Sequence, residues 1–274
     1  MKLHFTTPED YPSNQMMKAL SGQHEISSNP DSMPPDPDGL VLASTTSADY
    51  PDINKAKSES IPVLSIPELI YKLSTDKQRI VIAGSHGKSS IAKIIFKVLT
   101  HIKKPFDYAL WEPIEDIDCS VKISDAPIII IEGSEGPASK IDTEANFHKL
   151  NHHIAMITDL AHKHKEVYPA FDDYVKEFDR LADATPKAGT LVYNEEDALA
   201  TVIGGQERPD VKNIPFSSLK GIVNNDIASI QTDNGSIEIM GANEFSLLNL
   251  AGAKVLLNRI GVTHEEFFNA LKTN

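Results

Sequence analysis

Residues 80–90 read IVIAGSHGKSS, and this stretch decides the fold because it joins two kinds of element through a short turn bracketed by glycines. Residues 80–83 form an apolar run that is typical of a buried strand. After the stretch, apolar residues recur at the spacing of one helix face, at Ile91, Ile94, Ile95, Val98 and Leu99. The sequence therefore predicts a strand, a turn over 84–87 and an amphipathic helix.

The turn has the composition of a site for phosphate groups. Gly84 and Gly87 would let the backbone approach an anion, and the start of the helix would point its N–H groups at it. Lys88 would neutralise the β and γ oxygens of a triphosphate, and the Ser89 hydroxyl would ligate Mg²⁺. The alternative is a βα turn whose glycines serve tight packing alone. The predicted nucleotide-binding residues are Gly84, Ser85, His86, Gly87, Lys88, Ser89 and Ser90.

The stretch AGSHGKSS at 83–90 is similar to the ATP-binding loop of the Mur ligases, G-[ST]-x-G-K-[ST] between a strand and a helix. The general pattern G-x-x-x-x-G-K-[ST] would need a glycine where the chain has Ile82, which disfavours a generic P-loop kinase or GTPase. His86 and the surrounding sequence most resemble muramate:alanine ligases and ligases that recycle muropeptides, from about Leu40 to about Leu271. The resemblance implies ATP and Mg²⁺ as ligands and Lys88 as a catalytic residue.

The rest of the chain alternates predicted strands and helices, which favours an α/β fold with a mostly parallel sheet. Fully apolar runs are typical of strands that are covered on both faces. Asp233-Asn234-Gly235 predicts a hairpin, and 245–260 a helix that ends at Gly261. Capping boxes predict helix starts at Ser65 with Glu68 and at Thr263 with Glu266. The predicted strands are 40–43, 61–64, 80–83, 128–131, 154–157, 191–193, 227–232 and 236–240.

The resemblance implies an N-terminal UDP-binding domain, a central ATPase domain and a C-terminal domain that brings the amine. We expect residues 1–76 to form a degenerate Rossmann-like domain and residues 77–274 the central domain, with the C-terminal domain absent. The first βα turn of the family is rich in glycine, whereas this chain reads LHFTTPED at 3–10. Glu9 and Asp10 would repel a pyrophosphate, which disfavours binding of a uridine nucleotide.

Glu132 directly follows the apolar run 128–131, which places a carboxylate at the C-terminal edge of the sheet, where ligands bind in open α/β folds. The resemblance implies the same, because related ligases read E-[GA]-D-E-Y here and this chain reads EGSEG at 132–136. Both glutamates are kept, and Ser134 replaces the aspartate. We therefore predict that Glu132 is a Mg²⁺ ligand. The alternative is a helix cap or a solvated charge.

His164 matches a family histidine that helps to hold a second Mg²⁺, which makes it a candidate metal ligand and catalytic residue. Lys163 stands where the family has an aspartate, and a cation beside a metal position disfavours that second ion. A zinc site built from the histidines of 152–164 lacks cysteines and a well-spaced fourth ligand. We expect the other histidines of this stretch to be surface or loop residues.

The adenine motif of the family, G-x-H-N-x-x-N, is blurred at 241–249. Alignment backwards from Gly252 keeps Asn249, whereas alignment from Gly241 puts Asn243 at the histidine position, and both registers stay open. We predict Asn249 as a nucleotide-binding residue. The stretch NEED at 194–197 resembles another nucleotide-proximal segment, N-x-x-D, or is an acidic turn with an N-cap.

The composition excludes several classes of function. A formal net charge of −13 argues against general binders of nucleic acid or of anionic membranes. The single Cys119 cannot form an internal disulfide, and the N-terminus lacks the apolar stretch of a secretion signal, so we expect a cytoplasmic protein. No apolar run approaches the roughly 18 residues of a membrane span.

Two hypotheses follow. The first is an ATP-dependent carboxylate–amine ligase of peptidoglycan synthesis or recycling that acts on a UDP-muramyl substrate, with a partner that supplies the third domain. The second is a degenerate paralogue that binds nucleotide or a cell-wall ligase and serves as a regulator or scaffold. Lys163 and Ser134 favour the second for activity, and an ATPase assay distinguishes the two.

Overall fold

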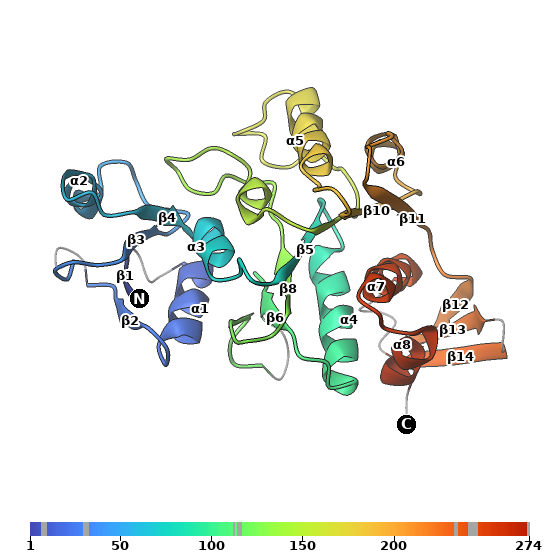
Figure 1. The fold of residues 1–274 in the computed structure, drawn as a ribbon. Helices are drawn as coiled ribbons and strands as arrows, with labels where there is room; N and C mark the ends of the chain where they lie inside the picture. The colour runs from blue at the N-terminus through green and yellow to red at the C-terminus, as the bar shows by residue number, and fades with distance from the viewer. Residues whose placement is uncertain are drawn as a thin grey trace.

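The computed structural model describes residues 1–6, 10–29, 33–111, 113, 117–232, 235–240 and 246–272. The chain forms an α/β structure in which three sheets follow one another (Figure 1). A small parallel sheet comes first, a larger and mostly parallel central sheet lies in the middle, and a three-stranded antiparallel sheet lies near the C-terminus. The predicted fold class is confirmed.

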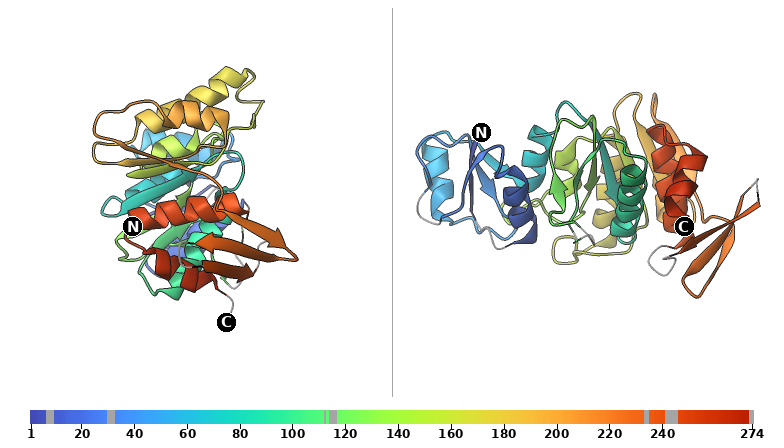
Figure 2. Two further views of the ribbon diagram at one scale, coloured as in Figure 1. Left: turned by 90° about the vertical axis from the view of Figure 1, so that its right-hand side faces the viewer. Right: turned by 90° about the horizontal axis from the view of Figure 1, so that it is seen from below.

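The N-terminal sheet has the strand order β2-β1-β3-β4, and all its pairs are parallel. In both figures α1 and α3 lie between this sheet and the central sheet (Figures 1 and 2). The two helices share a buried apolar cluster with the central sheet, which joins the two layers. The elements are β1 (Lys2–Phe5), α1 (Tyr11–Leu20), β2 (Glu25–Ser27), β3 (Gly39–Leu42), α2 (Pro51–Ser58), β4 (Val63–Ser65) and α3 (Ile66–Lys72).

The central sheet has the strand order β11-β10-β9-β5-β8-β6-β7, and β7 alone of these strands pairs antiparallel. β5 therefore lies in the middle, with β8 and β9 on its two sides. Its strands are β5 (Gln78–Ala83), β6 (Asp107–Ala109), β7 (Val121–Lys122), β8 (Ile128–Glu132), β9 (Ile154–Ile157), β10 (Thr190–Asn194) and β11 (Lys212–Phe216). The helices are α4 (Lys88–His101), η1 (Asn146–Leu150), α5 (Phe171–Asp183), α6 (Ala198–Gly204), α7 (Leu247–Arg259) and α8 (His264–Leu271).

Side chains of β5 alternate between two cores, as they must on a pleated strand covered on both faces. Ile80 and Ile82 belong to the core that α4, α7 and α8 close. Val81 and Ala83 belong to the core formed with α5, η1 and the N-terminal helices. This double cover explains why the β5 strand is apolar at consecutive positions.

The sequence located most of the central elements. Both predicted capping boxes form, because the backbone N–H of Ser65 donates to Glu68 and that of Thr263 donates to Glu266. The predicted hairpin consists of β13 (Ile227–Thr232) and β14 (Gly235–Met240), while Asp233 and Asn234 lie outside the described residues. A third strand, β12 (Gly221–Asn224), joins the hairpin and was not predicted. Among the described residues, no helix combines the length and apolarity needed to cross a membrane.

The burial of His152, which lies just before β9, leads us to expect a loss of stability in acid. Its side chain is buried, and Nε2 lies 3.0 Å from the Thr185 hydroxyl. Burial lowers the pKa of His152 from 6.5 to about 4, so the folded state binds fewer protons than the unfolded state between these values. The part of the unfolding free energy that is linked to neutral His152 is therefore fully present above pH 6.5. It falls as the pH drops toward 4, with a loss of about 2 kcal/mol at pH 5.

Urea denaturation at pH 7 and pH 5 measures this loss. His152→Gln should lose less unfolding free energy between the two pH values than the wild type. The control is His101→Gln, at the exposed end of α4, which should keep the wild-type pH dependence. Equal pH dependence in wild type and His152→Gln would show that burial of His152 does not govern acid stability.

Candidate nucleotide-binding site

The loop between β5 and α4 uses glycine where the backbone demands it. Gly84 has a φ of +133°, and Gly87, the N-cap of α4, has a φ of +82°. A Cβ at Gly84 would lie 1.9 Å from Thr158 Oγ1, and one at Gly87 would lie 2.8 Å from Asn249 Oδ1. Both glycines are thus required by the backbone conformation and by the close approach of neighbouring segments.

Gly84→Ala should destabilise the folded chain because the new methyl group needs a left-handed backbone and overlaps Thr158. We expect a loss of about 1–3 kcal/mol in unfolding free energy, measured by urea denaturation. Gly22→Ala is the matched control, because a Cβ there meets nothing within 4 Å and its φ is not positive. If both variants lose the same stability, the glycine requirement at the loop is refuted.

The N-terminus of α4 is open toward the loop. Within the part of the chain that the structure describes, no residue accepts a hydrogen bond from the backbone N–H groups of Lys88, Ser89 or Ser90, and Gly87 offers no side chain as a cap. These donors carry the positive end of the helix dipole. An anion at the loop would satisfy them, and this is the usual arrangement of a phosphate site.

Lys88 is held at the loop by a buried carboxylate. Its Nζ donates to the Gly84 carbonyl oxygen and lies 3.3 Å from Oε2 of Glu135. Glu135 is 2% exposed, and its Oε1 accepts a hydrogen bond of 3.4 Å from the Tyr174 hydroxyl. The Lys88 ammonium group therefore lies within the loop itself, where it can neutralise a bound anion.

Ser85 and His86 tie the loop to the segment that follows β9. The Ser85 N–H donates to the Asp159 carbonyl oxygen (3.0 Å), and its hydroxyl lies 2.7 Å from the Tyr174 hydroxyl. The His86 N–H donates to Oδ1 of Asp159 (2.6 Å), and His86 Nδ1 lies 2.7 Å from Oδ2. These two residues therefore hold the loop against the segment that follows β9.

Four residues of this arrangement were not among the predicted site residues: Glu135, Thr158, Asp159 and Tyr174. Thr158 and Asp159 directly follow β9, the strand next to β5, and the Thr158 hydroxyl donates to the His86 carbonyl oxygen (2.6 Å). Their position after an apolar strand was a usable signal, because the carboxyl ends of parallel neighbours meet at one edge. Tyr174 carried no such signal, since it reaches the loop from the first turn of α5.

The predicted metal ligands lie around the same edge. Glu132 ends β8, where it pairs in register with Ile82, and its Oε2 accepts a hydrogen bond of 2.6 Å from the Trp111 N–H. Ser89 lies in the first turn of α4. His164 has a φ of +51° and packs against the loop after β8, since a Cβ at Gly136 would lie 3.2 Å from its Nε2.

The predicted metal ligands Ser89 and Glu132 can supply only part of a Mg²⁺ coordination shell. Among the described residues, no three His, Cys, Asp or Glu side chains gather as a ready cluster of metal ligands. Mg²⁺ in nucleotide sites takes one or two protein oxygens and completes its shell with water and phosphate oxygens. Ser89 and Glu132 are oxygen donors of the kind that Mg²⁺ takes, and within the described ranges no all-protein cage is formed.

Lys163 contributes a second cation to the loop wall. Its Nζ donates to the carbonyl oxygen of Ser85, in the loop between β5 and α4. Lys163 thus reaches this loop from the segment that also carries His164. The imidazole Nδ1 of His164 lies 3.3 Å from Oε1 of Glu166. A positive charge therefore stands at the place where the family resemblance implies a second metal ion.

A small pocket adjoins the loop on the side of α7. It measures about 260 Å³, and its lining combines apolar side chains with two amides, two hydroxyls and the hydrogen-bonded pair of His86 and Asp159. Asn249, in the first turn of α7, lies against Gly87, whereas Asn243 lies outside the described residues. In the NEED stretch at 194–197, Asn194 lines this pocket and Asp197 is the N-cap of α6. The lining residues are His86, Gly87, Ile91, Thr158, Asp159, Asn194, Phe216, Ser246, Leu248 and Asn249.

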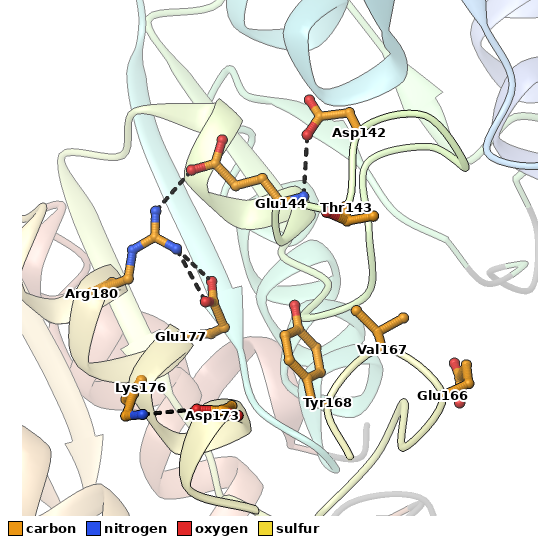
Figure 3. A pocket seen from close by; sticks show the side chains of 10 residues that line it. All are labelled: Asp142, Thr143, Glu144, Glu166, Val167, Tyr168, Asp173, Lys176, Glu177 and Arg180. Atoms are coloured by element: carbon orange, nitrogen blue, oxygen red, sulfur yellow. Dashed lines mark hydrogen bonds and ion pairs between the residues drawn. The ribbon is translucent and has the colours of Figure 1, made fainter. Parts of the chain in front are cut away.

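A larger cleft of about 770 Å³ lies between α5, the turn before η1 and the loop after His164 (Figure 3). Figure 3 shows pairs among several of its charged side chains: Arg180 bonds to Glu144 and Glu177, and Lys176 bonds to Asp173. Tyr168 lines this cleft and donates to the Glu135 carbonyl oxygen (2.9 Å). Tyr168 therefore joins the cleft to the residues around the β5–α4 loop, and the cleft lining holds more carboxylates than cations.

Comparison with known proteins places this geometry in a family. The profile of the Mur ligase middle domain matches residues 82–263. The chain is 26% identical over 237 residues to UDP-N-acetylmuramate--L-alanine ligase of Carboxydothermus hydrogenoformans, which covers 82% of this chain and 49% of that protein. A homologue of the same name from Desulfosudis oleivorans is 24% identical over 86% of this chain and 52% of its own length. The chain thus spans about half the length of these relatives.

Solved structures agree on the fold. The UDP-N-acetylmuramate:L-alanyl-gamma-D-glutamyl-meso-diaminopimelate ligase of Neisseria meningitides superposes with a TM-score of 0.82 at 14% identity, over 100% of this chain and 98% of that one. The UDP-N-acetylmuramate-alanine ligase of Thermotoga maritima gives a TM-score of 0.70 at 15% identity, over 99% and 68%. Because the middle-domain profile covers well over half of the sequence, this chain belongs to the Mur ligase family.

Proposed function

We propose that this chain binds ATP with Mg²⁺ at the loop between β5 and α4. The observation that carries the proposal is the open N-terminus of α4, where the N–H groups of Lys88, Ser89 and Ser90 meet no described acceptor. The Lys88 ammonium group at the same loop supplies the compensating charge. A triphosphate matches both features, and family membership supports the choice of ATP.

Each part of the ligand has a proposed place. The phosphates would lie along Gly87 and the first turn of α4, and the adenine in the pocket beside Asn194 and Asn249. Mg²⁺ would be held by Ser89 and Glu132, whose oxygen donors suit this ion. We also propose that residues 1–76 and 77–274 form two domains, and that the protein works in the cytoplasm.

As an enzyme, the chain would take part in an ATP-dependent carboxylate–amine ligation of peptidoglycan synthesis or recycling. A carboxylate oxygen bonds to the γ phosphorus while the β–γ bridge breaks and ADP leaves, and an amine then displaces the phosphate to form an amide. Catalysis of such a transfer rests on positioning and charge neutralisation. Lys88 would neutralise the charge on the phosphoryl oxygens, and His164 would help to bind a metal ion from the loop after β9.

A second candidate is a nucleotide-binding regulator or scaffold without ligase activity, with a cell-wall ligase as partner. Two observations favour it: Lys163 donates to the Ser85 carbonyl oxygen where the resemblance implies a metal-binding acid, and Ser134 replaces another acid. Losing one charge-neutralising contact in a transition state typically costs about 3–4 kcal/mol, or 10² to 10³ in rate. Nucleotide binding would then persist while turnover is lost.

Calorimetry with ATP, ADP and GTP in the presence of Mg²⁺ tests the binding proposal. ATP should bind and raise the melting temperature, and absence of any nucleotide binding would refute it. Phosphate release measured with and without UDP-N-acetylmuramate and an amine separates the two candidates. Release that depends on both substrates, with purified protein alone, supports the ligase and rejects the scaffold.

A further inference from the structure

Lys163 has a fixed place on the wall of the loop between β5 and α4. Its ammonium group donates to the Ser85 carbonyl oxygen. The same segment meets Ser85 again at Ala161, whose N–H donates to the Ser85 hydroxyl (2.7 Å) and whose carbonyl oxygen accepts from it (2.8 Å). His162 Nε2 lies 2.7 Å from the Tyr168 carbonyl oxygen. The segment is therefore positioned by contacts of its own, which lowers the entropy cost of presenting Lys163 to a ligand.

The charge of Lys163 is available to an anion. Counting the described residues alone, the Ser85 carbonyl oxygen is its single acceptor, and no carboxylate forms an ion pair with it. An ammonium group has three N–H donors, so two are left for a ligand. Lys88 differs, because its Nζ lies 3.3 Å from Oε2 of the buried Glu135, which balances its charge.

The loop needs this second cation to receive a polyphosphate. Among the described residues, the carboxylates that bond to positions 84–88 are those of Glu135, beside Lys88, and Asp159, beside His86. With His86 neutral, Lys88 against two carboxylates leaves one negative charge, and Lys163 brings the sum to zero. In a chain of formal net charge −13, a polyanion depends on such local cations.

Lys163 lies at the side of the loop away from the proposed adenine pocket. That pocket is lined in part by α7, which closes the core on one face of the central sheet. Lys163 bonds to Ser85, whose hydroxyl lies 2.7 Å from that of Tyr174 on α5, in the core on the other face (Figure 1). A nucleotide that extends from the pocket across Gly87 would therefore bring its terminal phosphate toward Lys163.

We propose that Lys163 binds the terminal phosphate of the nucleotide and supplies the positive charge that a second tightly held metal ion would otherwise bring. This assignment rests on the proposed function, because it concerns ATP at the same loop. It adds a basis for selectivity: the site distinguishes ATP from ADP by the charge at the end of the phosphate chain. Such selectivity serves a ligase and a nucleotide-binding regulator alike.

Calorimetric titrations of the whole chain with Mg²⁺ present test the assignment. The ligands are a non-hydrolysable ATP analogue, ADP and inorganic tripolyphosphate. The wild type should bind the ATP analogue at least about 10-fold more tightly than ADP. Lys163→Gln should weaken the ATP analogue and tripolyphosphate by about 10- to 100-fold, as expected for one lost charge-assisted hydrogen bond, and ADP by less than about threefold.

Three further variants make the comparison specific. Lys165→Gln is the matched control, because it removes one positive charge from an exposed position on the same segment, and it should change each affinity by less than about threefold. Lys163→Arg keeps the charge and should keep most of the preference for the ATP analogue. Lys163→Met keeps the length of the side chain and should repeat the loss, which covers the case in which Lys163→Gln does not fold.

Several outcomes would overturn the assignment while leaving nucleotide binding intact. These are wild-type affinity for the ATP analogue in a folded Lys163 variant without the charge, equal weakening of the ATP analogue and ADP, or equal binding of both by the wild type. Lys163-dependent binding of tripolyphosphate without binding of any nucleotide would instead refute the proposed function and keep the phosphate assignment. A wild type that binds none of the three ligands would refute both.

Discussion

Lys88→Ala should weaken binding of ATP with Mg²⁺ by about 10- to 100-fold, because the variant loses at least one charge-assisted contact of roughly 1.5–3 kcal/mol. It should also lower stability without nucleotide. Removing Lys88 leaves the Glu135 carboxylate buried at 2% exposure without its cation, and breaking a buried pair in this way typically costs about 3–5 kcal/mol. Calorimetry measures the first effect and urea denaturation the second.

The two effects can be separated with a second substitution. Lys88→Ala combined with Glu135→Gln removes the stranded charge, so the double variant should recover much of the stability and none of the nucleotide affinity. Lys97→Ala, at an exposed position on the same helix, should leave both unchanged. Wild-type ATP affinity in a folded Lys88 variant would reject the proposed site.

The elements around the loop could be predicted because their signals are local. The run of isoleucines at 128–131 and the apolar spacing of α4 report burial directly, and the capping boxes mark helix starts through side chains that bond only three residues away. Short strands such as β2 and β7 could not be found this way. With three and two residues, they owe their existence to pairing partners distant in sequence.

The candidate site likewise has residues that local sequence signals predict and residues that only the folded structure reveals. The candidate residues at 84–89 and at Glu132 could be found from their positions in the chain relative to strand ends. The residues that hold them in place depend on long-range packing, since Tyr174 on α5 contacts both Ser85 and Glu135. Asp10 shows the same limit. Its charge suggested repulsion of pyrophosphate, but only the fold shows that it caps α1 at Ser13 and accepts from the Ser44 N–H.

Glu132→Gln should lower the affinity for the metal ion in the ternary complex by about 10²- to 10³-fold. The expected reason is charge: a carboxylate about 4 Å from a cation contributes up to roughly 4 kcal/mol per pair of unit charges at an effective dielectric constant of about 20, or about 10³ in affinity. Glu132 is 2% exposed, yet glutamine keeps an oxygen that can accept from the Trp111 N–H. Stability without nucleotide should therefore change little, and a large loss would make Glu132 structural.

Titration with Mn²⁺, followed by electron paramagnetic resonance in the presence of an ATP analogue, measures both affinity and stoichiometry. We expect one tightly held ion in the wild type, because the Lys163 ammonium group at the Ser85 carbonyl oxygen repels a second cation beside His164. Lys163→Asp reverses that charge and should admit a second ion. Two tightly held ions in the wild type would contradict the assignment of Lys163 and restore the case for a fully equipped ligase site.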